Sequence, residues 1–196
     1  MPMDEHLSAD RALIAAFWSV VAEQGWGGAT MGRFAAASGR SMAELRARFP
    51  DRFAVLRLHL AVVDRTVLST VTAGESETVH DRLHDVIMCR VEALQPSREG
   101  ILRLAEHLPR DPLLALALMP ELLRSMAWML EAAHIETTGA TGALRAKGLL
   151  AVWLSVLRAW RDDEGADLAH TMAEADKALT RAGDWARRLG LAQPEP

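Results

Sequence analysis

Tyrosine is absent from this sequence of 196 residues, and cysteine occurs once, at Cys89. A single cysteine excludes an internal disulfide, and no charged-then-apolar leader with a small-residue cleavage site opens the sequence, so we expect a cytoplasmic protein. The most apolar stretch, residues 112–130, carries Pro120, Glu121 and Arg124 at its middle. Burying these groups in a bilayer costs several kcal/mol, so we predict a buried helix pair here and no membrane span.

Sequence signatures of catalysis are also missing. There is no Ser-His-Asp elbow, no Gly-rich phosphate loop and no paired-carboxylate motif. His80 and His84 lie four residues apart and would share one face of a helix, a spacing that can bind zinc. Because no third ligand lies nearby in the sequence, we expect both on a solvated face beside Asp81 and Asp85. We predict a protein that is not an enzyme and holds no metal or cofactor.

Charge is unevenly distributed along the chain. The net charge is -4, yet residues 31–65 contain seven arginines against three acidic residues. A basic head on an acidic body is expected where one end of a protein approaches phosphate, although a local excess of this size also arises by chance. Half of the residues are hydrophobic, which supplies a sizeable core.

Apolar residues recur at steps of three and four along most of the chain, and no stretch alternates apolar and polar residues as a half-buried strand does. We therefore predict an all-α protein of about nine to ten helices, at residues 8–25, 31–38, 42–49, 51–71, 79–94, 98–108, 112–119, 121–133, 142–161 and 167–189. The small, polar and acidic stretch 72–78 is the clearest boundary. We predict a head at 1–50, a connecting helix at 51–71 and a body at 72–196.

The second and third predicted helices have the spacing of a helix-turn-helix. Thr30 and Ser41 are suitable N-caps, and Gly39 supplies the left-handed residue that ends the second helix. Two short helices joined by a three-residue turn that contains glycine form this motif.

The stretch ALIAAFWSVVAEQGWGGATMGRFAAASGRSMAELRARFPDRFAVL (residues 12–56) resembles the N-terminal domain of TetR-type transcriptional regulators. The shared features are the Gly-aromatic loop, the capping threonine, the Gly-x-Ser turn and the Phe-Pro ending. The resemblance implies a TetR-like fold and a ligand-responsive homodimer whose two third helices enter successive major grooves of operator DNA. Carried onto this sequence, the DNA-binding residues are Thr30, Arg33, Arg40, Ser41, Met42, Glu44, Arg46 and Arg48.

Departures from the family pattern fall on the predicted DNA face. Arg40 stands where the family has a small apolar residue, and Arg46 stands where it has an aromatic tyrosine. Glu44 can accept a hydrogen bond from cytosine N4, or it repels phosphates. The neighbouring arginines can supply phosphate contacts, so the surface is altered but not abolished.

A second resemblance covers the body. Residues 95–187 look like the COQ9 family of ubiquinone biosynthesis proteins, on the basis of an apolar helix with a central tryptophan and a penultimate helix that contains AVWLSVLRAWRDD. This resemblance implies a TetR-like fold that binds lipid in an apolar cavity and does not act through DNA. The alternative function is therefore a lipid-binding accessory protein with a vestigial helix-turn-helix.

Methionine and tryptophan are concentrated in the body, on strongly apolar helices. Flexible thioethers and flat rings line pockets for apolar ligands, but they also fill ordinary cores. If a small apolar or lipid-like effector binds here, the candidate pocket residues are Met88, Leu104, Leu118, Met119, Leu122, Met126, Trp128, Met129 and Trp153.

The last predicted helix carries an apolar stripe that includes small residues, a pattern that permits close helix approach. In TetR-like proteins the last two helices of each subunit form a four-helix dimer interface, although such a stripe can also close the core of a monomer. The candidate interface residues are Leu154, Leu168, Met172, Leu179, Ala182 and Trp185.

Overall fold

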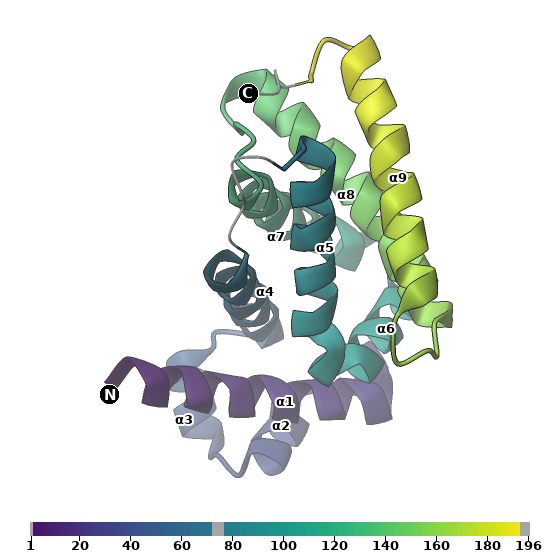
Figure 1. Cartoon of the computed structure of the whole chain (residues 1–196). Coiled ribbons are helices and arrows are strands. Elements are labelled where there is room, and N and C mark those ends of the chain that lie inside the picture. Colours follow the sequence, from purple (N-terminus) through teal and green to yellow (C-terminus); the bar gives the residue numbers. More distant parts are fainter. Residues whose placement is uncertain (1, 72–76, 193–196) are drawn as a thin grey trace. The chain divides into compact units, whose positions relative to one another are not determined.

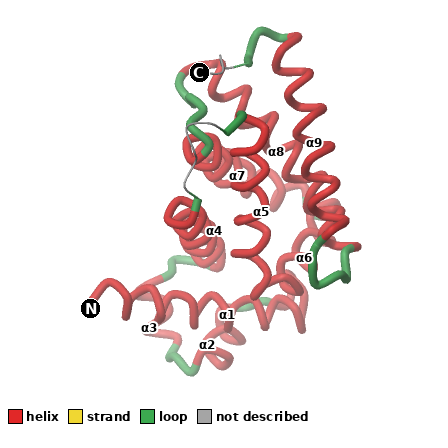
Figure 2. Tube along the Cα trace, in the orientation of Figure 1, coloured by secondary structure: helices red, strands yellow, loops and turns green. Residues whose placement is uncertain are grey.

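The computed structural model describes residues 2–71 and 77–192, with side chains from residue 8 onward. Within these ranges every regular element is a helix, which confirms the all-α prediction (Figures 1 and 2). The α-helices are α1 (Pro2–Gly28), α2 (Met31–Ser38), α3 (Met42–Arg48), α4 (Arg52–Thr70), α5 (Val79–Leu94), α6 (Arg98–His107), α7 (Pro112–Ala132), α8 (Gly139–Asp162) and α9 (Ala169–Arg188). Short 3₁₀ turns at Gln95–Ser97 and Leu108–Arg110 flank α6.

The described chain forms two compact units. The first contains residues 2–63 and 94–118, and the second contains residues 64–71, 77–93 and 119–192. Helices α4 and α7 each contribute residues to both units. Most of the predicted boundary at 72–78 lies outside the described residues, so its position stays a prediction.

Aromatic rings hold the first unit together around α1. Phe17 lies edge-on to Trp18, Trp26 and Phe34, with ring centroids 5.5 to 6.3 Å apart, a favourable arrangement of the ring quadrupoles. Phe34 of α2 also contacts Phe49, which follows α3. These contacts fix α2 and α3 against α1 and leave the other face of α3 exposed.

Several helix boundaries differ from the predictions; α1 begins at Pro2 and α8 at Gly139, where residues 8 and 142 were expected. Gly25 leaves the helical region, with φ 67° and ψ 170°, but helical bonding resumes beyond it as far as Gly28. Pro120 was expected to separate two helices, yet it lies inside the single helix α7, and this prediction was wrong. A proline removes one backbone hydrogen bond, and the apolar residues buried on both sides of it, Leu118 and Met126, offset that loss.

Helix α6 approaches α1 closely at Gly100. A Cβ atom at this position would lie 2.6 Å from the carbonyl oxygen of Trp18 and 2.7 Å from its ring. Since backbone cannot move aside as a flexible side chain can, Gly100→Ala is expected to destabilise the protein by about 1–3 kcal/mol, measured by urea unfolding. The matched control is Gly148→Ala in α8, where a Cβ meets nothing within 4 Å. Equal unfolding midpoints for the two variants would contradict the close approach.

Helices α8 and α9 pack side by side in the second unit (Figure 1). Ser155 donates a hydrogen bond to Glu174 at 2.7 Å, and Nε of Arg145 donates to the carbonyl oxygen of Leu191 at 2.9 Å. Because the earlier residue of α8 meets the later part of the C-terminal segment, the two helices are antiparallel. Their connection is anchored by Asp163, which accepts bonds from the amide and hydroxyl of Thr171.

A charged cluster lies inside the second unit. Arg90 is 1% exposed, and its NH1 donates to Oδ1 of Asp64 at 2.8 Å. The hydroxyl of Ser125 donates to the same oxygen at 2.5 Å, and the guanidinium lies 5.1 Å from the centre of the Trp153 ring. Burial lowers the pKa of Arg90, and the Asp64 carboxylate opposes that shift. Nε of Arg90 is buried without a hydrogen-bond partner, so the pairing with Asp64 carries most of the compensation for the buried charge.

Two helices, α7 and α8, are long and apolar enough to cross a membrane by length and composition. In the most apolar 18-residue segment of each helix, 33% of α7 and 39% of α8 is buried inside the protein. Core helices of soluble proteins meet the same criterion, so the expected absence of a membrane span stays a prediction.

Candidate nucleic-acid interface and ligand-binding surfaces

Helices α2 and α3 are joined by a three-residue turn that the sequence defines locally. The side chain of Thr30 accepts the backbone N–H of Arg33 at 3.3 Å, as expected of an N-cap. Gly39 has φ 65° in the left-handed region and ends α2, where a residue with a side chain would be strained. Ser41 then caps α3. The three capping positions expected from the sequence are confirmed.

Glu44 completes a capping box at the start of α3. Its Oε2 accepts the backbone N–H and the hydroxyl of Ser41, both at 2.8 Å, while the Glu44 N–H donates to the Ser41 hydroxyl at 3.2 Å. NH1 of Arg40 lies 3.4 Å from the other carboxylate oxygen. The hydrogen bonds from Ser41 lower the pKa of Glu44, so the carboxylate is ionised at neutral pH. Its position on α3 therefore has a structural reason, the stabilisation of the helix start.

The predicted DNA-binding residues all lie exposed on or beside α2 and α3. Three of the arginines already make contacts within the chain: Arg33 donates to the carbonyl of Gly28 at 2.7 Å, Arg40 contacts Glu44, and Arg48 forms an ion pair with Asp10. In the described part of the chain, no contact of the Arg46 side chain is recorded. Met42 is 52% exposed. Arg46 and Met42 are thus the side chains of α3 most available to a partner.

The predicted pocket residues are divided between the two units. Leu104 and Leu118 belong to the first unit, and the other seven belong to the second. Met126, Met129 and Trp153 are buried, and Met88 and Leu122 are half-buried. Met119 and Trp128 are exposed, by 39% and 50%. Their assignment to a ligand pocket stays a prediction.

A half-open groove of about 1050 Å³ lies instead between the start of α5, the end of α7, α8 and α9. Its apolar walls include Leu83, Leu130, Leu149, Val152 and Leu179, and basic side chains surround them. None of the nine predicted pocket residues lines it. The sequence signal that could have found it is the set of basic residues that alternates with glycine and alanine along α8.

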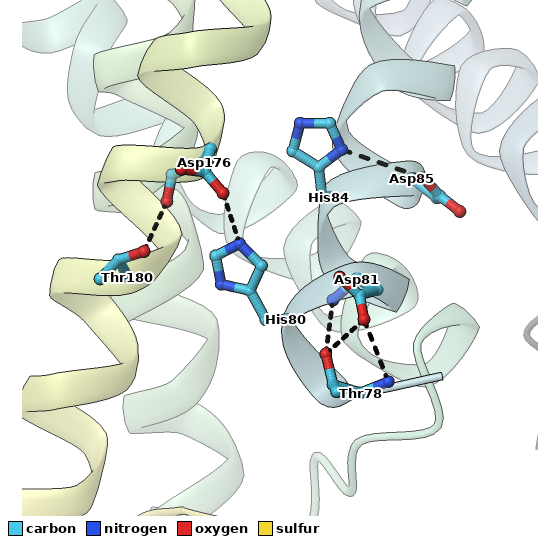
Figure 3. Close-up of polar contacts among 7 residues, drawn as sticks. All are labelled: Thr78, His80, Asp81, His84, Asp85, Asp176 and Thr180. Atoms are coloured by element: carbon cyan, nitrogen blue, oxygen red, sulfur yellow. Dashed lines mark hydrogen bonds and ion pairs between the residues drawn. The ribbon is translucent and has the colours of Figure 1, made fainter. Parts of the chain in front are cut away.

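The two histidines singled out in the sequence bind different partners (Figure 3). Nε2 of His80 lies 2.9 Å from Oδ1 of Asp176 and so connects the first turn of α5 with α9. Nδ1 of His84 lies 3.9 Å from Oδ1 of its neighbour Asp85. Among the described residues, no group of three His, Cys, Asp or Glu side chains is arranged to hold a metal ion.

The predicted interface residues fall into three sets. Leu154 and Met172 are exposed, by 40% and 42%, near the connection between α8 and α9. Leu168 and Leu179 are buried within the chain itself, so neither offers much surface to a second subunit. Ala182 and Trp185 line the groove.

Comparison with known proteins supports the fold. No protein-family profile and no curated protein sequence matches this chain. The structure is similar to the crystal structure of the TetR transcriptional regulator from Nitrosomonas europaea, with a TM-score of 0.66 and 22% sequence identity. The similarity covers 94% of this chain and 99% of that one. The protein therefore has a TetR-like all-α fold.

Proposed function

We propose that this protein is a TetR-type transcriptional regulator that binds operator DNA as a homodimer and responds to a small apolar or lipid-like effector. The observation that carries the proposal is the exposed surface of α2 and α3, held by two capped helix starts in a chain whose fold matches a TetR regulator along nearly its whole length. The expected protein is cytoplasmic and is not an enzyme.

In this proposal α3 enters the major groove and the arginines supply affinity. Arg46 has its charge free for a phosphate, while the exposed methyl end of Met42 can contact a thymine methyl group. Glu44 stays in its capping box, and Arg40 offsets part of its negative charge. Phosphate contacts then dominate, so binding depends strongly on salt.

Effector control follows from two states of the dimer. A ligand that binds more tightly to a form with the wrong spacing of the two reading helices shifts the population toward that form. The interface we propose uses the exposed apolar residues Leu154 and Met172, on adjacent helices near the α8–α9 connection.

Arg46→Ala is expected to weaken binding to DNA from upstream of the protein's own gene. It should also reduce the log-log salt slope by about one, as the loss of one phosphate contact requires. Fluorescence anisotropy over a range of salt concentrations measures both quantities. Arg103→Ala is the matched control, because Arg103 is an exposed arginine in α6. An unchanged slope in Arg46→Ala would show that α3 does not contact the phosphates.

A COQ9-like lipid-binding accessory protein is the second candidate. Two observations favour it: Glu44 and three of the four arginines are engaged within the chain, and the second unit contains a large groove with apolar walls. Native mass spectrometry of the purified protein distinguishes the candidates when combined with the DNA titration. A retained lipid without DNA binding would select the accessory protein.

A further inference from the structure

The groove between α5, α8 and α9 combines apolar walls with positive charge. Its basic lining residues are Arg145, Lys147, Arg158, Arg181 and Arg187. No aspartate or glutamate is among the described residues that line it, although the chain as a whole has a net charge of -4. We propose that this groove binds a long-chain alkyl anion, with the chain along the apolar walls and the head group against a cation of α8.

Three of these cations, all on α8, are not neutralised by a carboxylate in the described part of the chain. Arg145 donates to the carbonyl oxygens of Leu191 and Glu136, both at 2.9 Å, so its hydrogen bonds are used but its charge is not balanced. No contact is recorded for the side chains of Lys147 and Arg158. Both side chains are exposed, so their donors are free to form charge-assisted hydrogen bonds, the stronger kind, with an anionic head group.

The two remaining cations have partners on their own helix. Arg181 pairs with Glu174 at 2.8 Å, and Arg187 pairs with Asp184. They contribute less field to the groove than the cations of α8 do, because an adjacent carboxylate offsets each charge. The head group is therefore assigned to α8.

The space between the helices suits a chain-shaped ligand. Gly148 and Ala151 of α8, with Ala182 and Gly183 of α9, are small residues along the groove. A Cβ at Gly148 meets nothing within 4 Å, so the space beside it is open. The volume of about 1050 Å³ is slightly above the range typical of small-molecule sites.

The end of the groove near α5 is held in place by polar contacts. His80, which lines the groove, binds Asp176 of α9, and Thr180 donates to the Asp176 carbonyl oxygen at 3.0 Å (Figure 3). Thr78 and Asp81 form a capping box that fixes the first turn of α5. These contacts define the wall of the groove at this end.

A second copy of the chain is a poorer occupant than an anion. In a two-fold contact the same surface lies on both sides, so the unbalanced cations of two grooves would be brought into one interface. Like charges brought together without water are unfavourable. An alkyl anion meets both the apolar walls and the positive charge.

Isothermal titration calorimetry of the full chain with dodecanoate, below its micelle concentration, tests the proposal. We expect one site per chain and an affinity that falls with added salt. The variant Lys147→Ala/Arg158→Ala should bind about tenfold more weakly or worse, since the groove loses two of the three cations of α8 that no carboxylate balances. The matched control is Arg161→Ala/Lys177→Ala, which removes the same charge from α8 and α9 outside the groove. Its affinity should equal that of the wild type.

Two further measurements test separately the charge of the ligand and the location of its site. Dodecyltrimethylammonium has the same chain with the opposite charge and should bind more weakly than dodecanoate. Gly148→Trp should fill the open space and abolish binding, while Gly148→Ala should not. Absence of dodecanoate binding, equal binding of the two amphiphiles, or undiminished binding by Gly148→Trp would each overturn the proposal. If Gly148→Trp dissociates a dimer and the wild type does not bind dodecanoate, the proposal is overturned and the occupant of the groove is a second copy of the chain.

This proposal rests on the proposed function, because it specifies the effector site. Its test measures dodecanoate binding and does not involve DNA. Failure to bind dodecanoate would therefore leave the DNA titration with Arg46→Ala unaffected. Conversely, a protein that binds dodecanoate and not DNA would keep the groove assignment and support the accessory-protein candidate.

Discussion

Asp64→Asn is expected to destabilise the protein by about 3–5 kcal/mol. The substitution keeps the size of the side chain but removes the negative charge that faces Arg90 at 2.8 Å. The guanidinium is buried and already has one unpaired N–H, and among the described residues Asp64 is the carboxylate that pairs with it. An uncompensated buried charge then remains in the folded protein, whereas water solvates it in the unfolded chain.

Urea unfolding followed by circular dichroism measures this loss. The double variant Asp64→Leu/Arg90→Met removes both charges and should recover most of the stability, because a buried ion pair gains little over well-packed apolar residues. Asp162→Asn is the control: it removes a carboxylate from the exposed pair with Arg161 and should unfold at nearly the wild-type urea concentration. If Asp64→Asn unfolds no earlier than Asp162→Asn, the ion pair is not buried as described.

Helix ends and the chain reversal between α2 and α3 could be predicted because their signals are local. Thr30, Gly39 and Ser41 act through residues no more than five positions away. The capping role of Glu44 also has a local sequence signal, since Ser41-x-x-Glu44 has the capping-box spacing. Its expected place on the DNA face favours a base-reading or phosphate-repelling role, whereas in the structure its carboxylate caps the start of α3.

Pairings between distant residues could not be predicted in the same way. Arg48 meets Asp10 across 38 positions, and Arg90 meets Asp64 across 26. Each side chain alone suggests a solvated surface, and only the packing of separate helices brings the partners together. The charge excess in the head therefore overstated the number of arginines that are free to bind phosphate.

The groove could not be predicted from the sequence because the amino-acid composition of a helix does not distinguish a pocket from a core. Met126 and Met129 have the chemistry of pocket residues, yet they are fully packed inside the second unit. The basic residues of α8 and α9 are far apart in sequence, and the antiparallel packing of the two helices places them around one space. That packing depends on small residues whose role cannot be assigned until the helix partners are known.

Leu154→Glu/Met172→Glu is expected to convert a dimer into folded monomers. Both side chains are exposed in the isolated chain, so the change does not disturb the core of the subunit. In a two-fold interface each substitution occurs on both sides, which buries like charges close to one another. Desolvating unpaired carboxylates costs several kcal/mol, enough to dissociate a dimer of ordinary affinity.

Sedimentation velocity and DNA titration together check this result. The wild type should sediment near twice its chain mass of 21.5 kDa, and the double variant near the chain mass itself. The variant should also lose binding to a palindromic site, because two half-sites need two linked reading helices. Leu113→Glu is the matched control, since Leu113 is an exposed leucine of α7 and should leave the dimer intact.

A different response is expected from Leu179→Glu, which buries a charge inside the subunit and should unfold it. A wild-type monomer at working concentration would eliminate the two-half-site mechanism and leave the lipid-binding candidate.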